Sequence, residues 1–343
     1  MSSAAAVTAG ALSSGSPSSG PLLSVQDLKV HFAMDGGLFG RPGVVKAVEG
    51  VSFDLWPGET LGLVGESGCG KSTLGRAVLR LLPAKAGRIV WLGQDIAALS
   101  HEAMRQKRRD MQIIFQDPLA SLDPRMTIGQ IIAEPLRTFD PRLPAGEVKK
   151  RVQTMLAKVG LQPQHINRYP HEFSGGQCQR IGIARAMINN PKLIVCDEPV
   201  SALDVSIQAQ IVNLLMDLQR ETGMALIFIS HNLSVVRHIS HRIMVLYLGK
   251  VAEVADRDTI LQRPLHPYTQ ALISAVPIPD PDLEQARGHL LLKGDLPSPL
   301  NPPSGCAFRS RCPKATSICA ELEPQLRAAS GTHRVACHHA VMP

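Results

Sequence analysis

Residues 60–73 read TLGLVGESGCGKST, and this stretch decides the fold. The apolar run at 60–64 is typical of a buried strand, and the pattern after Lys71 favours a helix. Between them, glycines free the backbone to turn successive N–H groups inward, where they cradle an anion. The pattern G-x-x-x-x-G-K-[ST] at 65–72 is that of a P-loop, whose lysine reaches the β- and γ-phosphates. The loop predicted to hold a nucleoside triphosphate comprises Gly65, Glu66, Ser67, Gly68, Cys69, Gly70, Lys71, Ser72 and Thr73.

A pair of acidic residues supplies the metal ligand and the water-polarising group that the P-loop lacks. The run KLIVCDEP at 192–199 places Asp197 and Glu198 at the end of a buried strand. We expect Ser72 and Asp197 to hold Mg²⁺, the aspartate directly or through water, and Glu198 to polarise the attacking water. Both ends of one nucleotide site are then accounted for.

Strand and helix patterns alternate along the first part of the chain. Strands are predicted at 24–33, 51–59, 60–64, 111–115, 192–196, 224–230 and 243–249. Within 206–223, the apolar residues from Ile207 to Leu218 recur on one helix face, and Gly223 ends that helix. This alternation predicts an α/β fold with a mostly parallel sheet covered on both faces.

The chain divides by composition into three parts. Residues 1–22 are rich in Ser, Ala and Gly and are predicted to be a disordered tail rather than a signal peptide. Residues 23–263 form the predicted α/β domain, with a helical subdomain at about 117–190, where no strand pattern occurs. Residues 264–343 form a proline-rich extension with a cysteine cluster, and its proline-rich stretch is predicted to be neither helix nor central strand.

Charge and hydropathy limit the classes of partner and the cellular location expected for the chain. The net charge of +7 suits phosphate ligands, nucleic acid or an anionic membrane face, without choosing among them. No apolar run reaches the length of a membrane span. We therefore expect the chain to stay in the cytoplasm and to reach a membrane only by docking on another protein.

Residues 173–180, FSGGQCQR, together with the P-loop, resemble the signature of ABC-type ATPases. The match continues in the family's order with Gln116 as the Q-loop glutamine, SALD at 201–204 as the D-loop, and His231 as the switch histidine. Phe173 stands where leucine is commoner. The resemblance implies a P-loop ABC-type nucleotide-binding domain, in which two ATPase subunits meet head to tail and share each ATP.

The same resemblance assigns a role to each motif. It implies that a partner's nucleotide is covered by the signature and D-loop residues Ser174, Gly175, Gly176, Gln177 and Asp204. Gln116 is the third residue expected at Mg²⁺, where it senses the metal and the attacking water, and His231 bridges the γ-phosphate and the neighbouring chain. The family often stacks adenine on an aromatic residue upstream of the P-loop. Here Phe39 is one candidate, and an apolar contact from Val45 or a neighbour is the other.

Three longer segments narrow the type of ABC protein. Residues 115–136, 198–215 and 266–277 resemble the ATP-binding subunits of bacterial oligopeptide and dipeptide importers, over roughly 24–343, and the P-loop region is closer to the second ATPase subunit of such systems. This implies ATP hydrolysis that powers peptide uptake at the cytoplasmic face of the inner membrane. It also implies a homologous ATPase partner, two integral membrane permease subunits and an extracytoplasmic peptide-binding protein. The alternative within the same family is that this chain serves an importer of nickel, haem or glycosides.

The alternative is an ABC-type ATPase of DNA repair or translation. Such proteins usually carry two ATPase units, long coiled coils or large signature insertions, none of which this sequence contains. A nucleic-acid surface also requires clustered basic residues with interleaved aromatics. The run RQKRRD at 105–110 is short and contains no aromatic residue, which favours a solvated helix face. We therefore expect no nucleic-acid partner.

Four of the seven cysteines lie near the carboxyl end with the spacing C-x₅-C-x₆-C-x₁₇-C. This spacing lacks the CxxC pairs of zinc ribbons, and an odd number of cysteines in a cytosolic chain argues against disulfides. The resemblance implies a structural [4Fe–4S] cluster on Cys306, Cys312, Cys319 and Cys337. Zinc, with His333 or His338 as a further ligand, and unliganded thiols remain the alternatives.

Overall fold

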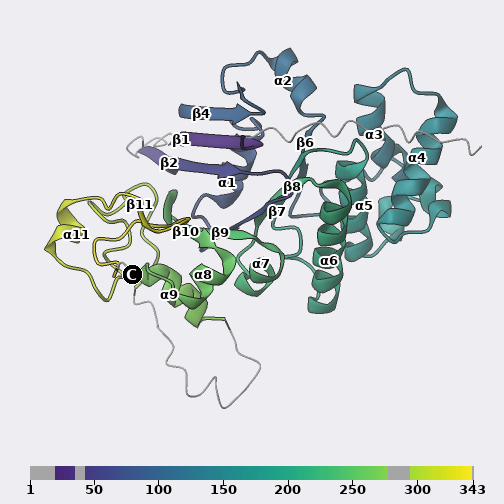
Figure 1. Cartoon of the computed structure of the whole chain (residues 1–343). Coiled ribbons are helices and arrows are strands. Elements are labelled where there is room, and N and C mark those ends of the chain that lie inside the picture. The colour runs from purple at the N-terminus through teal and green to yellow at the C-terminus, as the bar shows by residue number, and fades with distance from the viewer. Residues whose placement is uncertain (1–19, 35–42, 277–293, 342–343) are drawn as a thin grey trace, which may run out of the picture.

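Two β-sheets form the framework of the protein (Figure 1). The structure is a computed structural model that describes residues 20–34, 43–276 and 294–341. The predicted tail, apart from residues 20–22, and Phe39 lie outside the described residues. A four-stranded antiparallel sheet has the order β2-β1-β4-β5 and contains β1 (Leu23–Met34), β2 (Gly43–Leu55), β4 (Ala86–Trp91) and β5 (Gln94–Asp95).

The larger sheet has eight strands in the order β11-β12-β10-β9-β3-β8-β7-β6. Its strands are β3 (Thr60–Val64), β6 (Met111–Ile114), β7 (Leu193–Asp197), β8 (Ala225–Ile229), β9 (Arg242–Tyr247), β10 (Lys250–Asp256), β11 (Arg327–Ser330) and β12 (His333–Val335). The part from β9 to β6 is parallel, as the sequence predicts. The loops that follow β3, β6, β7 and β8 therefore open at one edge, where ligands of α/β sheets bind.

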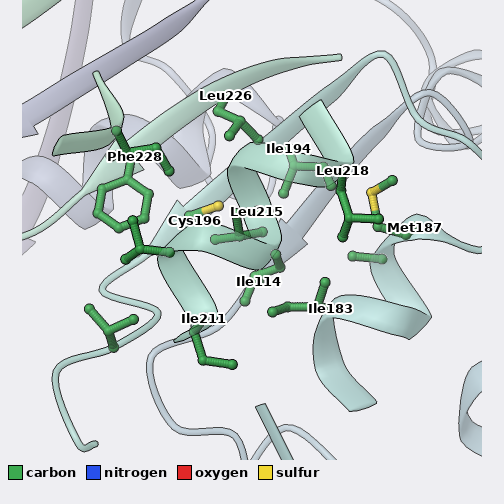
Figure 2. Packing of buried hydrophobic residues seen from close by; sticks show 14 of the residues in the cluster. Ile114, Ile183, Met187, Ile194, Cys196, Ile211, Leu215, Leu218, Leu226 and Phe228 are labelled. Atoms are coloured by element: carbon green, nitrogen blue, oxygen red, sulfur yellow. The ribbon is translucent and has the colours of Figure 1, made fainter. Parts of the chain in front are cut away.

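Alternating apolar residues explain why both faces of this sheet are covered. In β7, Ile194 and Cys196 point to one face, while Leu193 and Val195 belong to the core on the other. Helices α5 (Gly175–Met187) and α6 (Val205–Thr222) cover the first face, where Ile183 and Leu215 meet the strands (Figure 2). Helix α1 (Lys71–Val78) and the four-stranded sheet cover the second face.

Residues 117–190 fold mostly into helices. Residues 117–190 contain α3 (Ile128–Phe139), α4 (Ala145–Lys158), the short 3₁₀ helices η1 (Pro163–Asn167) and η2 (Pro170–Glu172), and α5, with no strand. Ile132 of α3, Leu156 of α4 and Ile181 of α5 are fully buried in one cluster. In Figure 1, α3 and α4 lie beyond α5, away from the sheet. The remaining helices of the core are α2 (His101–Lys107), α7 (Leu233–Ile239) and α8 (Arg257–Gln262).

The proline-rich extension contains more regular structure than the sequence predicts. Helix α9 (Pro267–Ser274) forms where a helix was excluded, because Pro267 occupies its first position, where no N–H is needed. His266 caps this helix, since its Nδ1 accepts from the Tyr268 N–H at 3.0 Å. Burial lowers the pKa of His266 to about 4, which keeps that nitrogen free to accept. A short helix, α11 (Ser317–Glu321), follows among the cysteines.

The extension is joined to the core through a buried carboxylate. Strand β12 pairs antiparallel with β10, in the register Glu253↔Val335. The fully buried Glu253 accepts from the N–H groups of Leu265 at 2.7 Å and His266 at 2.9 Å, and bonds His333 Nε2 at 2.7 Å. The core sheet therefore continues into the extension. His333, one of the alternative zinc ligands, uses its Nε2 to bond Glu253.

Candidate nucleotide site

The P-loop connects β3 to α1 through backbone conformations that only glycine adopts readily. Gly65 has φ 149° and Gly70 has φ 104°. A Cβ on Gly70 would lie 2.1 Å from the Ala47 carbonyl oxygen, and one on Gly65 would lie 2.3 Å from that of Leu246. The two glycines therefore let the loop lie against neighbouring backbone while its N–H groups turn toward the pocket.

Lys71 closes this loop from the inside. Its ammonium donates to the carbonyl oxygens of Gly65 at 2.8 Å and Glu66 at 2.9 Å, and the residue is 4% exposed. A pocket of about 540 Å³ opens beside it. The pocket is lined by Val45, Lys46, Ala47, Ser67, Gly68, Gly70, Lys71, Ser72, Thr73, Gln116, Glu198, His231, Leu248, Gly249 and Pro299. Most of the predicted loop residues are thus brought together around one cavity.

Three predicted loop residues lie outside this lining: Gly65, Glu66 and Cys69. The Glu66 N–H donates to the hydroxyl of Tyr268 at 2.8 Å, so this amide points away from the pocket. Cys69 is 1% exposed, and burial raises the pKa of its thiol, which therefore stays neutral. These residues shape the loop rather than face the cavity.

Two of the three predicted Mg²⁺ residues, Ser72 and Asp197, lie in direct contact, whereas the third, Gln116, bonds Glu198. Ser72 Oγ donates to Asp197 Oδ1 at 2.5 Å, and Arg76 pairs with the other carboxylate oxygen at 3.1 Å. Asp197 is 1% exposed at the end of β7. A hydroxyl beside a buried carboxylate provides the hard oxygen ligands that Mg²⁺ prefers, so these residues fit the ion.

The three predicted catalytic residues meet at one carboxylate oxygen. Glu198 Oε2 accepts from Gln116 Nε2 at 3.3 Å and lies 3.2 Å from His231 Nδ1. Glu198 has φ 49°, a left-handed conformation that is rare for glutamate, and its N–H donates to the Ile229 carbonyl of β8. The loops after β6, β7 and β8 thus bring these side chains to the mouth of the P-loop pocket.

The signature residues are placed elsewhere on the chain. Ser174 caps α5 in a box with Gln177, whose N–H donates to Ser174 Oγ at 3.4 Å. Ser174, Gly175, Gln177 and Asp204 are exposed, and Gly176 is half-buried. None of these residues lines the pocket. One chain therefore places its signature away from its own P-loop.

Several residues at the site were missed by the sequence analysis. Pro299 of the extension lines the pocket together with the predicted Val45. Arg311, also of the extension, grips Glu66 through two hydrogen bonds of 2.7 and 2.9 Å. Tyr268 lies in the segment 266–277, which marks the importer family in the sequence, but nothing in that segment indicates its contact with the P-loop.

The four clustered cysteines approach one another. Burial, together with the charges of the other three, raises the pKa of Cys306 to about 11, and similar effects raise those of Cys312 and Cys337. Cys306 also donates its N–H to the carbonyl of Cys319 at 2.8 Å. Within 20–34, 43–276 and 294–341, however, no three His, Cys, Asp or Glu side chains are arranged to hold a metal ion.

Comparisons with known proteins agree with this geometry. The oligopeptide transport ATP-binding protein OppF of Salmonella typhimurium is 60% identical over 319 residues, covering 92% of this chain and 95% of its own. AppF of Bacillus subtilis, which bears the same description, is 54% identical over 92% of this chain and 97% of its own. The solved cbiO1 of Clostridium perfringens, part of the ABC transporter complex cbiONQ, has a TM-score of 0.61 at 26% identity, covering 71% of this chain and 92% of its own.

A second solved structure is the dimeric ATP-binding cassette MJ0796 with ADP and phosphate, at 28% identity and a TM-score of 0.61, covering 68% of this chain and 98% of its own.

The ABC transporter family model matches residues 48–201, which hold the P-loop, the signature and Glu198. An ABC-type ATPase is the class that this fold and site define. The model of the oligopeptide/dipeptide transporter C-terminal region matches 252–319. The chain belongs to the family of oligopeptide/dipeptide transporter ATP-binding proteins.

Proposed function

We propose that this chain is an ATPase subunit that hydrolyses Mg·ATP to power the uptake of dipeptides and oligopeptides through membrane subunits. The observation that carries the proposal is the convergence of Lys71, Ser72 and Glu198 on one pocket, with the buried Asp197 bonded to Ser72. Relatives that are 54–60% identical over nearly their whole length are named oligopeptide transport ATP-binding proteins, which supports the peptide cargo.

In this proposal each residue of the site has one role. Backbone N–H groups of the P-loop, the start of α1 and Lys71 bind the phosphates. Ser72 and Asp197 would hold Mg²⁺, and the ion would supply positive charge to neutralise the transferred phosphoryl group. Glu198 takes a proton from the attacking water. Gln116 and His231 orient the Glu198 carboxylate through their contacts with its Oε2. The protein therefore acts by positioning and by charge stabilisation.

A second, homologous ATPase subunit is part of this proposal. The signature residues Ser174, Gly175 and Gln177 and the D-loop residue Asp204 are exposed on their own chain, so they are available to cover a nucleotide bound by another. Val205, next to Asp204, is 82% exposed, so the same surface also presents an apolar side chain. The solved dimeric cassette MJ0796 supports such pairing.

The membrane partners follow from the helical region. A groove of about 520 Å³ lies between α3 and α4 and includes Ala133, Val148 and Val152. We propose that 117–190 is a helical subdomain of the core 23–263 and that this groove, together with Gln116, receives two integral membrane permease subunits. An extracytoplasmic peptide-binding protein would deliver the cargo. Among the described residues, no helix has the length and hydropathy to cross a membrane, which suits peripheral attachment at the cytoplasmic face.

Reconstitution of the purified complex in liposomes tests the function. We expect ATP hydrolysis to rise several-fold when the binding protein and an oligopeptide are both present, and labelled peptide to accumulate inside. Nickel, haem and a glycoside are the matched cargo controls. Stimulation by DNA or RNA, with copurifying ribosomal or repair proteins in place of membrane subunits, would replace this function with the repair or translation class.

The basic residues Arg105 and Arg109 argue against that class, because they pair with Glu102 and Asp140.

We further propose that Cys306, Cys312, Cys319 and Cys337 hold a [4Fe–4S] cluster that stabilises residues 264–343 as the extension of the core. The hydrogen bond from the Cys306 N–H to the Cys319 carbonyl supports a shared centre, and a cluster is larger than a single ion, so its thiolates lie farther apart. The alternative is zinc. Both candidate histidine ligands have other partners, because His333 bonds Glu253 and His338 bonds the Leu322 carbonyl.

Anaerobic purification tests the centre. The chain is expected to contain iron and sulfide in equal amounts and to show the visible absorbance of a cluster. Cys312→Ser is expected to lose both, while Cys178→Ser, a buried cysteine of α5, is the control that keeps them. Stoichiometric zinc without iron would establish the alternative, and a metal-free protein with an intact fold would leave four free thiols.

A further inference from the structure

Arg311 connects the C-terminal extension directly to the P-loop. Its two terminal guanidinium nitrogens donate to the two carboxylate oxygens of Glu66, at 2.7 and 2.9 Å. The Arg311 side chain is 9% exposed and that of Glu66 is 28% exposed, so the pair is largely shielded from water. A two-bond contact of this kind fixes both distance and orientation.

The extension holds Arg311 firmly in this place. The Arg311 N–H donates to the Phe308 carbonyl at 3.0 Å, within the loop that carries Cys306 and Cys312. Phe308 packs edge-on against Tyr247 of β9, with ring centroids 5.2 Å apart, and tilted against Tyr268 at 5.4 Å. Phe308 is 2% exposed and Tyr268 is fully buried. The loop that carries Arg311 is therefore anchored by a packed aromatic cluster through Phe308.

Glu66 is held at three points. Arg311 binds its carboxylate, the Tyr268 hydroxyl accepts from its N–H at 2.8 Å, and Lys71 donates to its carbonyl oxygen at 2.9 Å. The next two residues, Ser67 and Gly68, line the nucleotide pocket. The position of the phosphate-binding amides therefore depends on a residue that the extension grips.

The charge of Glu66 makes this grip necessary. A carboxylate one residue from the pocket lining repels a triphosphate, since like charges disfavour each other most strongly where water is scarce. Arg311 supplies the opposite charge at hydrogen-bond distance. We propose that Arg311 is a positioning residue of the ATP site, which neutralises Glu66 and fixes the P-loop for the triphosphate. The proposal rests on the function proposed above and adds the extension to the nucleotide site of the same chain.

The test compares nucleotide affinities of full-length variants. Arg311→Met is expected to weaken Mg·ATP binding about tenfold, because the carboxylate of Glu66 is left uncompensated. Adenosine, which has no phosphates, is expected to bind within about twofold of its wild-type affinity. Adding Glu66→Gln to Arg311→Met removes the repulsion and is expected to recover several-fold of the lost ATP affinity. Competition against a fluorescent ATP analogue measures all of these affinities.

Arg309→Met is the matched control, because Arg309 lies in the same loop but its guanidinium bonds only Ser304. It is expected to leave ATP affinity unchanged. Arg311→Lys keeps the charge without the planar fork and is expected to weaken binding about threefold, which also serves if Arg311→Met does not fold. Equal effects of Arg311→Met and Arg309→Met, a parallel loss of adenosine affinity, or no rescue by Glu66→Gln would overturn the proposal. A wild-type chain that binds no ATP would overturn the proposed function and this inference together.

Discussion

Glu198→Gln is expected to lower ATP hydrolysis at saturating Mg·ATP by about 10²- to 10⁴-fold while ATP still binds. The amide has the size of the carboxylate but cannot take a proton from water. The contacts proposed for Lys71 with the phosphates and for Ser72 with Mg²⁺ do not involve Glu198. Gln116 and His231 lose their charged acceptor, so the water also loses its orientation.

The measurement is single-turnover hydrolysis by the isolated chain, so that no second type of subunit contributes an intact site. Nucleotide binding is followed in parallel, because affinity should stay within a few-fold of wild type. Glu147→Gln is the control: Glu147 is a carboxylate of α4 that pairs with Arg151 on the surface. Unchanged turnover in Glu198→Gln would mean that another group activates the water.

Glu253→Ala is expected to lower the free energy of unfolding by about 3–5 kcal/mol, the largest stability effect that we predict. The carboxylate is fully buried and accepts from Leu265, His266 and His333. Alanine leaves two backbone N–H groups and an imidazole without their acceptor, in a place that water does not reach. The junction between β10, α9 and β12 should therefore fail first.

Urea unfolding followed by circular dichroism measures this loss. Glu323→Ala is the matched control, because Glu323 also links the extension to β10, through Lys250, but is 49% exposed. A surface pair of this kind contributes about 1 kcal/mol or less. Glu253→Gln keeps one carbonyl acceptor and should fall between the two. Equal losses for Glu253→Ala and Glu323→Ala would show that the buried carboxylate does not join the extension to the sheet.

The sequence predicts the features of this protein that are local. The P-loop lies within one short stretch, and its strand and helix follow from apolar runs and glycines. The parallel strands and α6 likewise have their periodicities written in consecutive residues. Because the carboxyl ends of parallel strands share an edge, Gln116, Asp197, Glu198 and His231 could be expected to meet, and the structure brings them together.

What the sequence does not predict depends on contacts between distant residues. Strand β12 is short and polar, and it becomes a strand because β10 offers its free edge and Glu253 accepts from His333. Prolines were interpreted as breaking the helix at 267–274, although Pro267 is harmless at its first position. The grip of Arg311 on Glu66 joins residues 245 positions apart, and no local pattern marks either one.

The strand order has a mechanical consequence. Strand β6, which leads toward the helical region, and β11 of the extension form opposite margins of one continuous sheet, and β3 lies between them. In the proposed complex, a membrane subunit would contact α3 and α4 on the β6 side, and the extension joins the sheet on the β11 side. Strand β3, which leads into the P-loop, lies between the two margins, so a displacement at either one would reach it through neighbouring strands.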